Sequence, residues 1–498
     1  MWYLSTRNEK IRKTPAEAVL KGIADDGGLY MPMSFEGASF PMEQLIKMSP
    51  KEISAKVLSI LFSGDSMFPE YNNKEEEFLK AVKRGYDGKF DDEDYAPLSK
   101  VGDAYVMELY HGPTCAFKDV ALQLLPQLIA EAKRATGMKE EIVILTATSG
   151  DTGSAALSGF SDVEGTKIIV FYPKHGISAV QERQMVSCNG KNTCVVAVEG
   201  NFDDAQSGVK NIFATLELPE GVKLSSANSI NIGRLAPQVA YYFKAYKDLL
   251  LADEIKMGDK VNFIVPTGNF GDILAGYFAM NMGLPVGKLV CASNENKVLT
   301  DFFENGSYNK NREFHVTKSP SMDILISSNL ERLLYLVCGA EKCAQYMKDL
   351  KENGEYKISK DELDKIRAVF DAGFADDKTT LEVINDVYNK HGYIMDTHTA
   401  VAWKVYEDWA KDHGNGLKSV VLSTASAYKF SNSVMNAIGK EYDDEFDALE
   451  KLNAITGAKI PGSLVGIRDK KIVHNNVVKK EDMLAFVADM VGKREWTK

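Results

Sequence analysis

The sequence predicts an α/β protein in which mostly parallel sheets carry helices on both faces. From Val101 onward, short apolar runs are followed by glycine-rich or polar turns and then by helical patterns. This alternation favours parallel sheets, because each helix returns the chain to the start of the next strand. With 498 residues, the chain is long enough for roughly two to four domains.

Composition indicates a globular protein and argues against several classes of partner. Apolar residues make up 45% of the chain, charged residues 26%, and the net charge is −11. This negative charge disfavours binding to nucleic acid or to an anionic membrane surface, so an anionic substrate would need a local basic cluster. No secretory signal and no uncharged apolar run of about 18 residues is present. Six scattered cysteines suit reduced thiols, so we expect a cytoplasmic protein without a metal.

Residues 1–100 are expected to form a mainly helical N-terminal domain. Thr14-Pro-Ala-Glu17 has the form of a helix start, with a capping threonine and a proline in the first turn. Residues 25–32 carry turn residues, and the acidic run 91–94 marks a boundary.

The α/β part is expected to span 101–498 and to contain two subdomains. The smaller is expected at about 140–250 and the larger at about 261–498, with a possible helical insertion at about 342–389. The expected strands are 141–146, 167–172, 193–198, 261–265, 289–292 and 418–422. The expected helices are 120–132, 154–160, 179–186, a segment from near 203, 273–282 and 430–438.

Three of the expected turns offer groups that can bind a ligand at the carboxyl ends of strands, where open parallel sheets hold ligands. Residues 148–153, Thr-Ser-Gly-Asp-Thr-Gly, combine hydroxyl and N–H groups before a helix. Residues 267–272, Thr-Gly-Asn-Phe-Gly-Asp, offer successive N–H groups and are expected to cradle a phosphate. The turn around Thr424 offers hydroxyls and Lys429. Each turn alone is equally compatible with an ordinary helix start.

Lys118 is a candidate amine nucleophile. It stands in the segment 111–119, His-Gly-Pro-Thr-Cys-Ala-Phe-Lys-Asp, which runs directly into the apolar helical pattern. Desolvation at such a position lowers the pKa of a lysine, and the neutral amine can form a Schiff base with an aldehyde. The motif alone is also compatible with a surface lysine after a turn.

Two further clusters are candidate binding sites. Asn231, Arg234 and Gln238 lie near one face if their segment is helical, and an arginine with amide groups suits an anionic phosphoester. A solvated helix end would explain the same residues. His391 and His398 near Asp396 are interpreted as loop chemistry and not as a metal site.

Together these segments closely resemble the threonine synthase family, which consists of pyridoxal-phosphate enzymes of fold type II, the tryptophan synthase β family. The matching segments follow the family order over nearly the whole chain: 5–8, 24–32, 111–119, 148–153, 228–238, 265–272, 319–323, 327–332 and 423–430. The resemblance implies a type II fold with two mostly parallel sheets, a mainly helical N-terminal domain, and pyridoxal 5'-phosphate as cofactor.

The resemblance also implies a role for each matching site residue. By it, Lys118 forms the Schiff base, Phe117 flanks the cofactor, and Thr424 bonds the pyridine nitrogen. By the same resemblance, the cofactor phosphate is bound by Gly268, Asn269, Phe270, Gly271 and Asp272, and the ring oxygen faces Asp151. The substrate carboxylate is bound by Ser149, Gly150 and Thr152, and the substrate phosphate by Asn231 and Arg234.

The implied reaction converts O-phospho-L-homoserine and water to L-threonine and phosphate, with Lys118 as the base, in a monomer or homodimer. Two positions depart from related sequences. Asp151 stands where relatives of the wider fold often carry asparagine, so that a carboxylate near the ring oxygen needs a proton or a hydrogen-bond donor. Ser426-Ala427 stands where many members carry His-Pro.

Two other functions were considered. A β-eliminating or β-replacing relative, such as a threonine dehydratase or a cysteine synthase, would keep the cofactor, but it would need neither the long N-terminal unit nor the cluster of Asn231 and Arg234. A relative that only binds a metabolite or a partner would not need Lys118.

Overall fold

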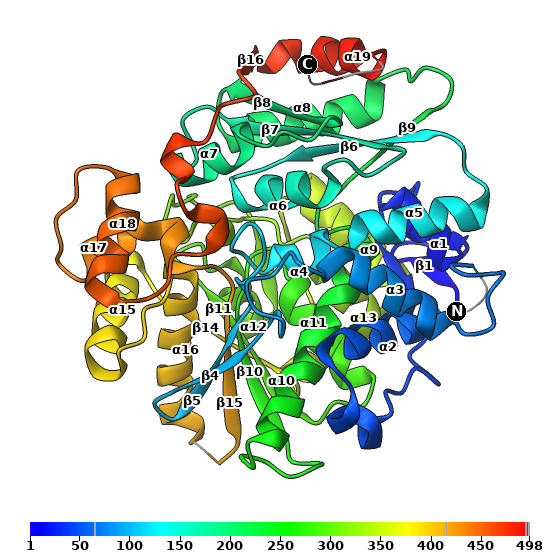
Figure 1. Ribbon diagram of the computed structural model, residues 1–498. Helices are drawn as coiled ribbons and strands as arrows, with labels where there is room; N and C mark the ends of the chain where they lie inside the picture. Colours follow the sequence, from blue (N-terminus) through cyan, green and yellow to red (C-terminus); the bar gives the residue numbers. More distant parts are fainter. Residues whose placement is uncertain (64–65, 415, 494–495, 497–498) are drawn as a thin grey trace.

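Two parallel sheets flanked by helices form the body of the molecule in the computed structural model, which describes residues 1–63, 66–414, 416–493 and 496 (Figure 1). The smaller sheet is entirely parallel and has the order β16-β8-β7-β6-β9. Its strands are β6 (Glu141–Ala147), β7 (Thr166–Pro173), β8 (Thr193–Glu199), β9 (Val222–Ser225) and β16 (Asn476–Lys479).

The larger sheet has the order β14-β11-β10-β15-β5-β4 and is parallel except for its edge strand β4. Its strands are β4 (Leu98–Val101), β5 (Ala104–Glu108), β10 (Val261–Pro266), β11 (Val286–Ser293), β14 (Phe370–Phe374) and β15 (Lys418–Ser423). The predicted α/β architecture with two mostly parallel sheets is therefore confirmed.

Helices cover both faces of the two sheets, and along the described chain none is long and apolar enough to cross a lipid bilayer. They are α4 (Lys118–Leu122), α5 (Leu125–Thr136), α6 (Asp151–Phe160), α7 (Ala179–Val186), α8 (Phe202–Thr215), α9 (Ile232–Leu235), α10 (Val239–Leu251), α11 (Gly271–Asn281), α12 (Val298–Asn305), α13 (Leu330–Glu352), α14 (Lys360–Arg367), α15 (Asp377–His391), α16 (Thr397–His413), α17 (Ser431–Ala437), α18 (Glu445–Thr456) and α19 (Met483–Val491).

The single helix expected over 120–132 is divided into α4 and α5. Pro126 stands in the first turn of α5 and has no N–H to bond the carbonyl of Leu122, so the helix has to begin again. The break leaves α4 as a short helix that begins at Lys118, between the two sheets (Figure 1).

The N-terminal unit contains a small antiparallel sheet as well as helices. The sheet has the order β2-β1-β3, from β1 (Tyr3–Ser5), β2 (Arg12–Lys13) and β3 (Tyr30–Pro32), and the helices are α1 (Pro15–Lys21), α2 (Pro50–Leu61) and α3 (Lys74–Tyr86). Thr14 caps α1 in the predicted manner. The unit shares one continuous core with the rest of the chain, and the ring of Phe40 stacks on Phe243 at 4.2 Å between centroids.

Two expected boundaries differ from the structure. The segment 342–389 is not only helical, because it contains β14, the edge strand beside β11, and β13 (Glu355–Lys357), which pairs with β12 (Ser307–Asn309). The larger subdomain does not run to residue 498, because β16 pairs with β8 and α19 packs beside α8 on the smaller sheet (Figure 1). Both strands are short edge strands with polar residues, so neither produces a long apolar run.

Candidate active site

A cavity of about 560 Å³ lies where the carboxyl ends of strands from both sheets face each other. The turns after β6, β10 and β15 line it, as does α4, which follows the turn after β5. Most predicted site residues are on its wall: Phe117, Lys118, Ser149, Asp151, Thr152, Arg234, Gly268, Asn269, Phe270, Gly271, Asp272 and Thr424. Gly150 and Asn231 are not among the lining residues.

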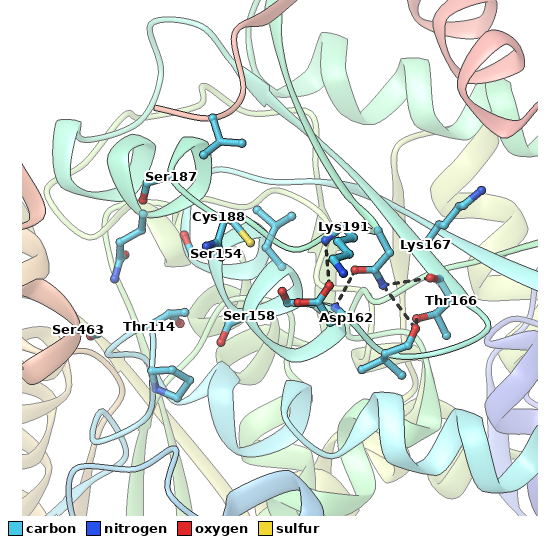
Figure 2. A pocket seen from close by; sticks show the side chains of 18 of the residues that line it. Thr114, Ser154, Ser158, Asp162, Thr166, Lys167, Ser187, Cys188, Lys191 and Ser463 are labelled. Carbon is cyan, nitrogen blue, oxygen red and sulfur yellow. Dashed lines mark hydrogen bonds between the residues drawn. The ribbon is translucent and has the colours of Figure 1, made fainter. Parts of the chain in front are cut away.

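A second, larger hollow of about 1420 Å³ opens between α6, α7 and the segment 463–473 (Figure 2). Its polar groups serve the fold. The backbone N–H of Lys191 donates to the Asp162 carboxylate at 2.9 Å, and the Asn192 amide donates to the carbonyl of Thr166 at 3.0 Å. Because it holds none of the predicted site residues, we assign the chemistry to the first cavity.

Lys118 is held at the bottom of the first cavity by the neighbouring strand. The N–H of Phe117 donates to the carbonyl of Thr424 at 2.8 Å, which ties the start of α4 to the end of β15. The Lys118 Nζ lies 4.8 Å from the centroid of the Phe117 ring and 3.5 Å from Oδ2 of Asp151. Burial lowers the pKa of Lys118, and Lys429 and Arg234 lower it further against the opposing effect of Asp151. The site therefore favours the neutral amine more strongly than water does.

Asp151 is a heavily bonded carboxylate of the cavity wall. Its Oδ1 accepts from Lys429 at 2.7 Å and from the Gln181 amide at 2.9 Å, and its Oδ2 accepts from the Ser321 hydroxyl at 2.9 Å. Burial alone would raise the pKa of Asp151, but the ammonium group of Lys429, and Lys118 when it is protonated, hold it well below its usual range. The hydrogen-bond donor that the sequence required for this carboxylate is thus present.

Lys429 is a site residue that the sequence analysis did not assign. It lies in a 3-10 turn, η4 (Ala427–Phe430), which is capped by the Ser426 hydroxyl that accepts from the N–H of Tyr428 at 3.3 Å. The only sequence signal was a lysine inside an otherwise apolar and small-residue run after β15. Its partner, Asp151, is too distant in the chain for spacing to reveal the pair.

The turn before α6 presents hydroxyls to the cavity and is shaped by a glycine. The Thr148 hydroxyl accepts from the N–H groups of Gly150 and Gly153, both at 2.9 Å. Gly150 has φ 129°, and a Cβ there would lie 2.5 Å from the Gln181 side chain. The structure therefore gives Gly150 a role in shaping the turn, whereas Ser149 and Thr152 lie on the cavity wall.

The turn before α11 exposes backbone to the cavity and turns its aromatic ring away. A Cβ on Gly268 would lie 2.7 Å from the Ser321 carbonyl, so only glycine fits there. Phe270 has φ 61°, and its buried ring packs against Phe303 and Phe370. Phe270 can therefore offer its backbone but not its ring to a ligand, as expected of a phosphate cradle.

Asp272 places a carboxyl group in the first turn of α11. Its Oδ1 accepts from the hydroxyls of Tyr241 and Tyr242, while its buried Oδ2 has no hydrogen-bond partner within the described chain. Burial raises the pKa of Asp272 to about 7. A neutral carboxylic acid at this position can donate a hydrogen bond to an anion, which an ionised carboxylate cannot do.

We expect Asp272→Asn to stabilise the cofactor-free protein more as the pH rises from 5 to 8. The folded-state pKa of Asp272 lies above its unfolded value, so its favourable contribution is full at low pH and is lost as the pH rises through about 7. Asparagine cannot ionise, so the variant does not lose this stability as the pH rises. Thermal unfolding at several pH values measures the difference in Tm between variant and wild type, and a difference that does not change with pH would contradict this account.

Arg234 and Asn231 have different roles although they are neighbours. The Asn231 side chain is fully buried; its amide donates to the Val19 carbonyl at 3.0 Å and its Oδ1 caps α9 by accepting from Gly233 at 2.9 Å. The short Asn231 side chain therefore does not reach the cavity, because its amide bonds Val19 and its Oδ1 caps α9. Arg234 does reach the wall.

The Arg234 guanidinium is prepared for an anion. It is 2% exposed, its Nη1 donates to the Ala227 carbonyl, and its buried Nε has no partner within the described residues. Burial lowers the pKa of Arg234 to about 10. A buried donor without a partner is costly, so this atom indicates a ligand with an acceptor group.

His398 lines the cavity, although the sequence does not assign it to the site. Its Nδ1 lies 2.6 Å from the Asp396 carboxylate, and its Nε2 accepts from the Ser321 N–H at 3.1 Å, which makes Nδ1 the donor to Asp396. His398 does bond a loop residue, as expected, and in addition it lines the cavity and holds Ser321, whose hydroxyl donates to Asp151.

The cavity fits pyridoxal phosphate on the grounds of these residues alone. It combines a lysine with a lowered pKa, a backbone cradle in which only glycine fits, and two buried polar atoms that lack partners in the described chain, on Arg234 and Asp272. The amine suits an aldehyde, and the cradle suits a phosphate.

Comparison with known proteins covers nearly the whole chain. A family model described as pyridoxal-phosphate dependent enzyme matches residues 95–426, and models described as threonine synthase N terminus and threonine synthase, C-terminal match 2–77 and 399–471. The threonine synthase of Pseudomonas aeruginosa is 37% identical over 443 residues, which cover 88% of this chain and 90% of that protein.

Two further similarities concern a longer protein and a solved structure. Threonine synthase-like 1 of Pongo abelii is 39% identical over 445 residues, which cover 85% of this chain but only 58% of that longer protein. The crystal structure of threonine synthase from Brucella melitensis with bound pyridoxal phosphate has a TM-score of 0.86 and 38% identity, and the match covers 99% of this chain and 98% of that one.

Proposed function

Because the chain belongs to the threonine synthase family of pyridoxal-phosphate-dependent enzymes, we propose that it converts O-phospho-L-homoserine and water to L-threonine and phosphate. The observation that carries this proposal is the pairing of two groups in one cavity. Lys118 offers an amine with a lowered pKa, and Arg234 offers a buried guanidinium nitrogen without a partner in the described chain. One suits a carbonyl cofactor and the other a phosphorylated substrate.

Pyridoxal phosphate, when bound, withdraws electrons from the substrate carbons and so stabilises a carbanion there. We assign its phosphate to the backbone of the 268–271 turn and to Asp272, its pyridine nitrogen to Thr424, and its ring oxygen to the surroundings of Asp151. This assignment is supported by the positions of these residues, which line the same cavity as Lys118.

Lys118 is the group that moves protons in this proposal. With pyridoxal phosphate bound, Lys118, whose pKa burial lowers, would take a proton from Cα, return it to the conjugated system of cofactor and substrate, and then take a second proton from Cβ. Arg234 holds the substrate phosphate, which leaves from Cγ, and water then adds at Cβ. The ring of Phe117 keeps bulk water away from one side of Nζ.

The N-terminal unit supports the phosphate side of the site. The Val19 carbonyl at the end of α1 accepts the amide of Asn231, which in turn caps the helix that carries Arg234. The N-terminal unit therefore helps to hold the Arg234 guanidinium in place. An enzyme whose substrate carries no phosphate would not need this support. A cytoplasmic location and a monomer or homodimer remain predictions from composition and resemblance.

Separate incubations with phosphohomoserine, threonine and serine test the proposal against a dehydratase or a cysteine synthase. We expect phosphate release from phosphohomoserine and little keto acid from the other two amino acids. Keto acid from threonine, with no phosphate release from phosphohomoserine, would refute the proposed reaction while leaving the cofactor assignment intact.

A further inference from the structure

Two lysines, Lys429 fully buried and Lys118 12% exposed, share a single carboxylate in the cavity. Lys429 is 0% exposed and its Nζ lies 2.7 Å from Oδ1 of Asp151, whereas Lys118 lies 3.5 Å from Oδ2 of the same residue. Lys429 also donates to the Thr114 carbonyl at 2.8 Å, which fixes its ammonium group in the turn before Lys118. Asp151 therefore has its close ion pair with Lys429 and only a longer contact with Lys118.

The charges around Lys118 come from several elements, and most of them are already balanced. Asp151 and Asp272 are the acids that act on it, from the starts of α6 and α11, and Arg234 from α9 and Lys429 from η4 are the bases. His398 from α16 is linked to Asp151 through Ser321, and the Asp119 carboxylate beside Lys118 accepts from the N–H and hydroxyl of Thr114. Burial leaves Asp272 only partly ionised near neutral pH, so Asp151 is the main group that could stabilise an ammonium on Lys118.

We propose that Lys429 is a positioning residue that neutralises Asp151 and thereby keeps Nζ of Lys118 free of its proton and ready to bond a carbonyl carbon. This inference rests on the proposed use of Lys118 as the cofactor-binding lysine. In that step the Nζ lone pair attacks the aldehyde carbon, and the aldehyde oxygen leaves as water with the two amine protons. A protonated Lys118 has no lone pair for the attack, so the rate of cofactor attachment depends on the charge left on Asp151.

The test is the pH dependence of the rate at which pyridoxal phosphate attaches to the cofactor-free protein, followed by the visible absorbance of the lysine-bound cofactor. We expect Lys429→Met to move the profile to higher pH, with an attachment rate at pH 7 reduced by about tenfold or more, because each pKa unit changes the neutral fraction by that factor. Lys429→Arg, which keeps the charge, should lie close to wild type.

Lys244→Met is the matched control. Lys244 is also 0% exposed and is paired with Asp94 and Asp248 at 2.6 Å, but it lies on α10 away from the cavity wall. This variant should lose stability without moving the attachment profile. The comparison separates a general cost of removing a buried ion pair from an effect on Lys118.

A double-variant cycle tests whether Lys429 acts through Asp151 and also serves if Lys429→Met alone does not fold. In an Asp151→Asn background, removing Lys429 leaves no unpaired carboxylate, so the additional change in attachment rate should be within about threefold. An unchanged profile for Lys429→Met, or the same shift in both backgrounds, would overturn the proposal. Neither readout uses phosphohomoserine, so a failure of the proposed reaction would be seen separately as cofactor attachment without threonine formation.

Discussion

Lys118→Ala is expected to abolish both covalent attachment of pyridoxal phosphate and turnover while leaving the fold intact. Removal of the amine removes the nucleophile and the base together. Among the described residues, the other lysines that line the cavity are Lys21 and Lys210. The fold should survive because Asp151 keeps its bonds to Lys429, Gln181 and Ser321. Absorbance spectra with added cofactor measure attachment, phosphate release from phosphohomoserine measures turnover, and circular dichroism with thermal unfolding measures the fold.

Lys118→Arg is the control for charge, since it keeps a cation near Asp151 but cannot form the covalent bond. It should behave like the alanine variant in spectrum and turnover. Retention of the visible band in either variant would place the attachment site on another lysine and would contradict the assignment of Lys118.

Arg234→Ala is expected to raise KM for phosphohomoserine and to reduce kcat/KM by about 2–4 kcal/mol, the effect of removing a charged donor aimed at an anion. Arg234 lines the cavity, and its buried Nε lacks a partner among the described residues, so it has capacity for one more acceptor. Steady-state kinetics with phosphohomoserine, together with inhibition by inorganic phosphate, measure the loss.

Two variants control for general effects of charge and packing. Lys210→Ala removes a positive charge from an exposed residue that lines the cavity, and it should change kcat/KM little. The Lys210 Nζ donates to the Gln206 side chain at 3.4 Å. Arg234→Lys should recover part of the loss. A change below about tenfold for Arg234→Ala would argue against its role in binding phosphate.

The central strands could be predicted from the sequence because each is an apolar run that both faces of its sheet bury. β6, β7, β8 and β10 follow the expected positions closely, since parallel strands covered by helices need continuous apolar residues. The strands at the sheet edges, β14 and β16, could not be recognised, because one partner and partial exposure permit short polar sequences.

The site could be predicted as a set of turns but not as a set of contacts. Turn chemistry and resemblance placed Lys118 and the 267–272 turn on the wall, where the structure has them. Asn231 and Arg234 have the same helical context, and only tertiary packing determines that one bonds Val19 and the other reaches the cavity. The pair of Lys429 and Asp151 joins distant segments, so no local spacing signals it.

Simultaneous measurement of phosphate and threonine, in one reaction with O-phospho-L-homoserine and added cofactor, tests the proposed function most directly. We expect the two products in equal amounts, because the base Lys118 and the phosphate-binding Arg234 act on the same bound molecule and water replaces the departing phosphate. Phosphate accompanied by a keto acid would retain the elimination but contradict the addition of water, and no phosphate release would contradict the proposed reaction altogether.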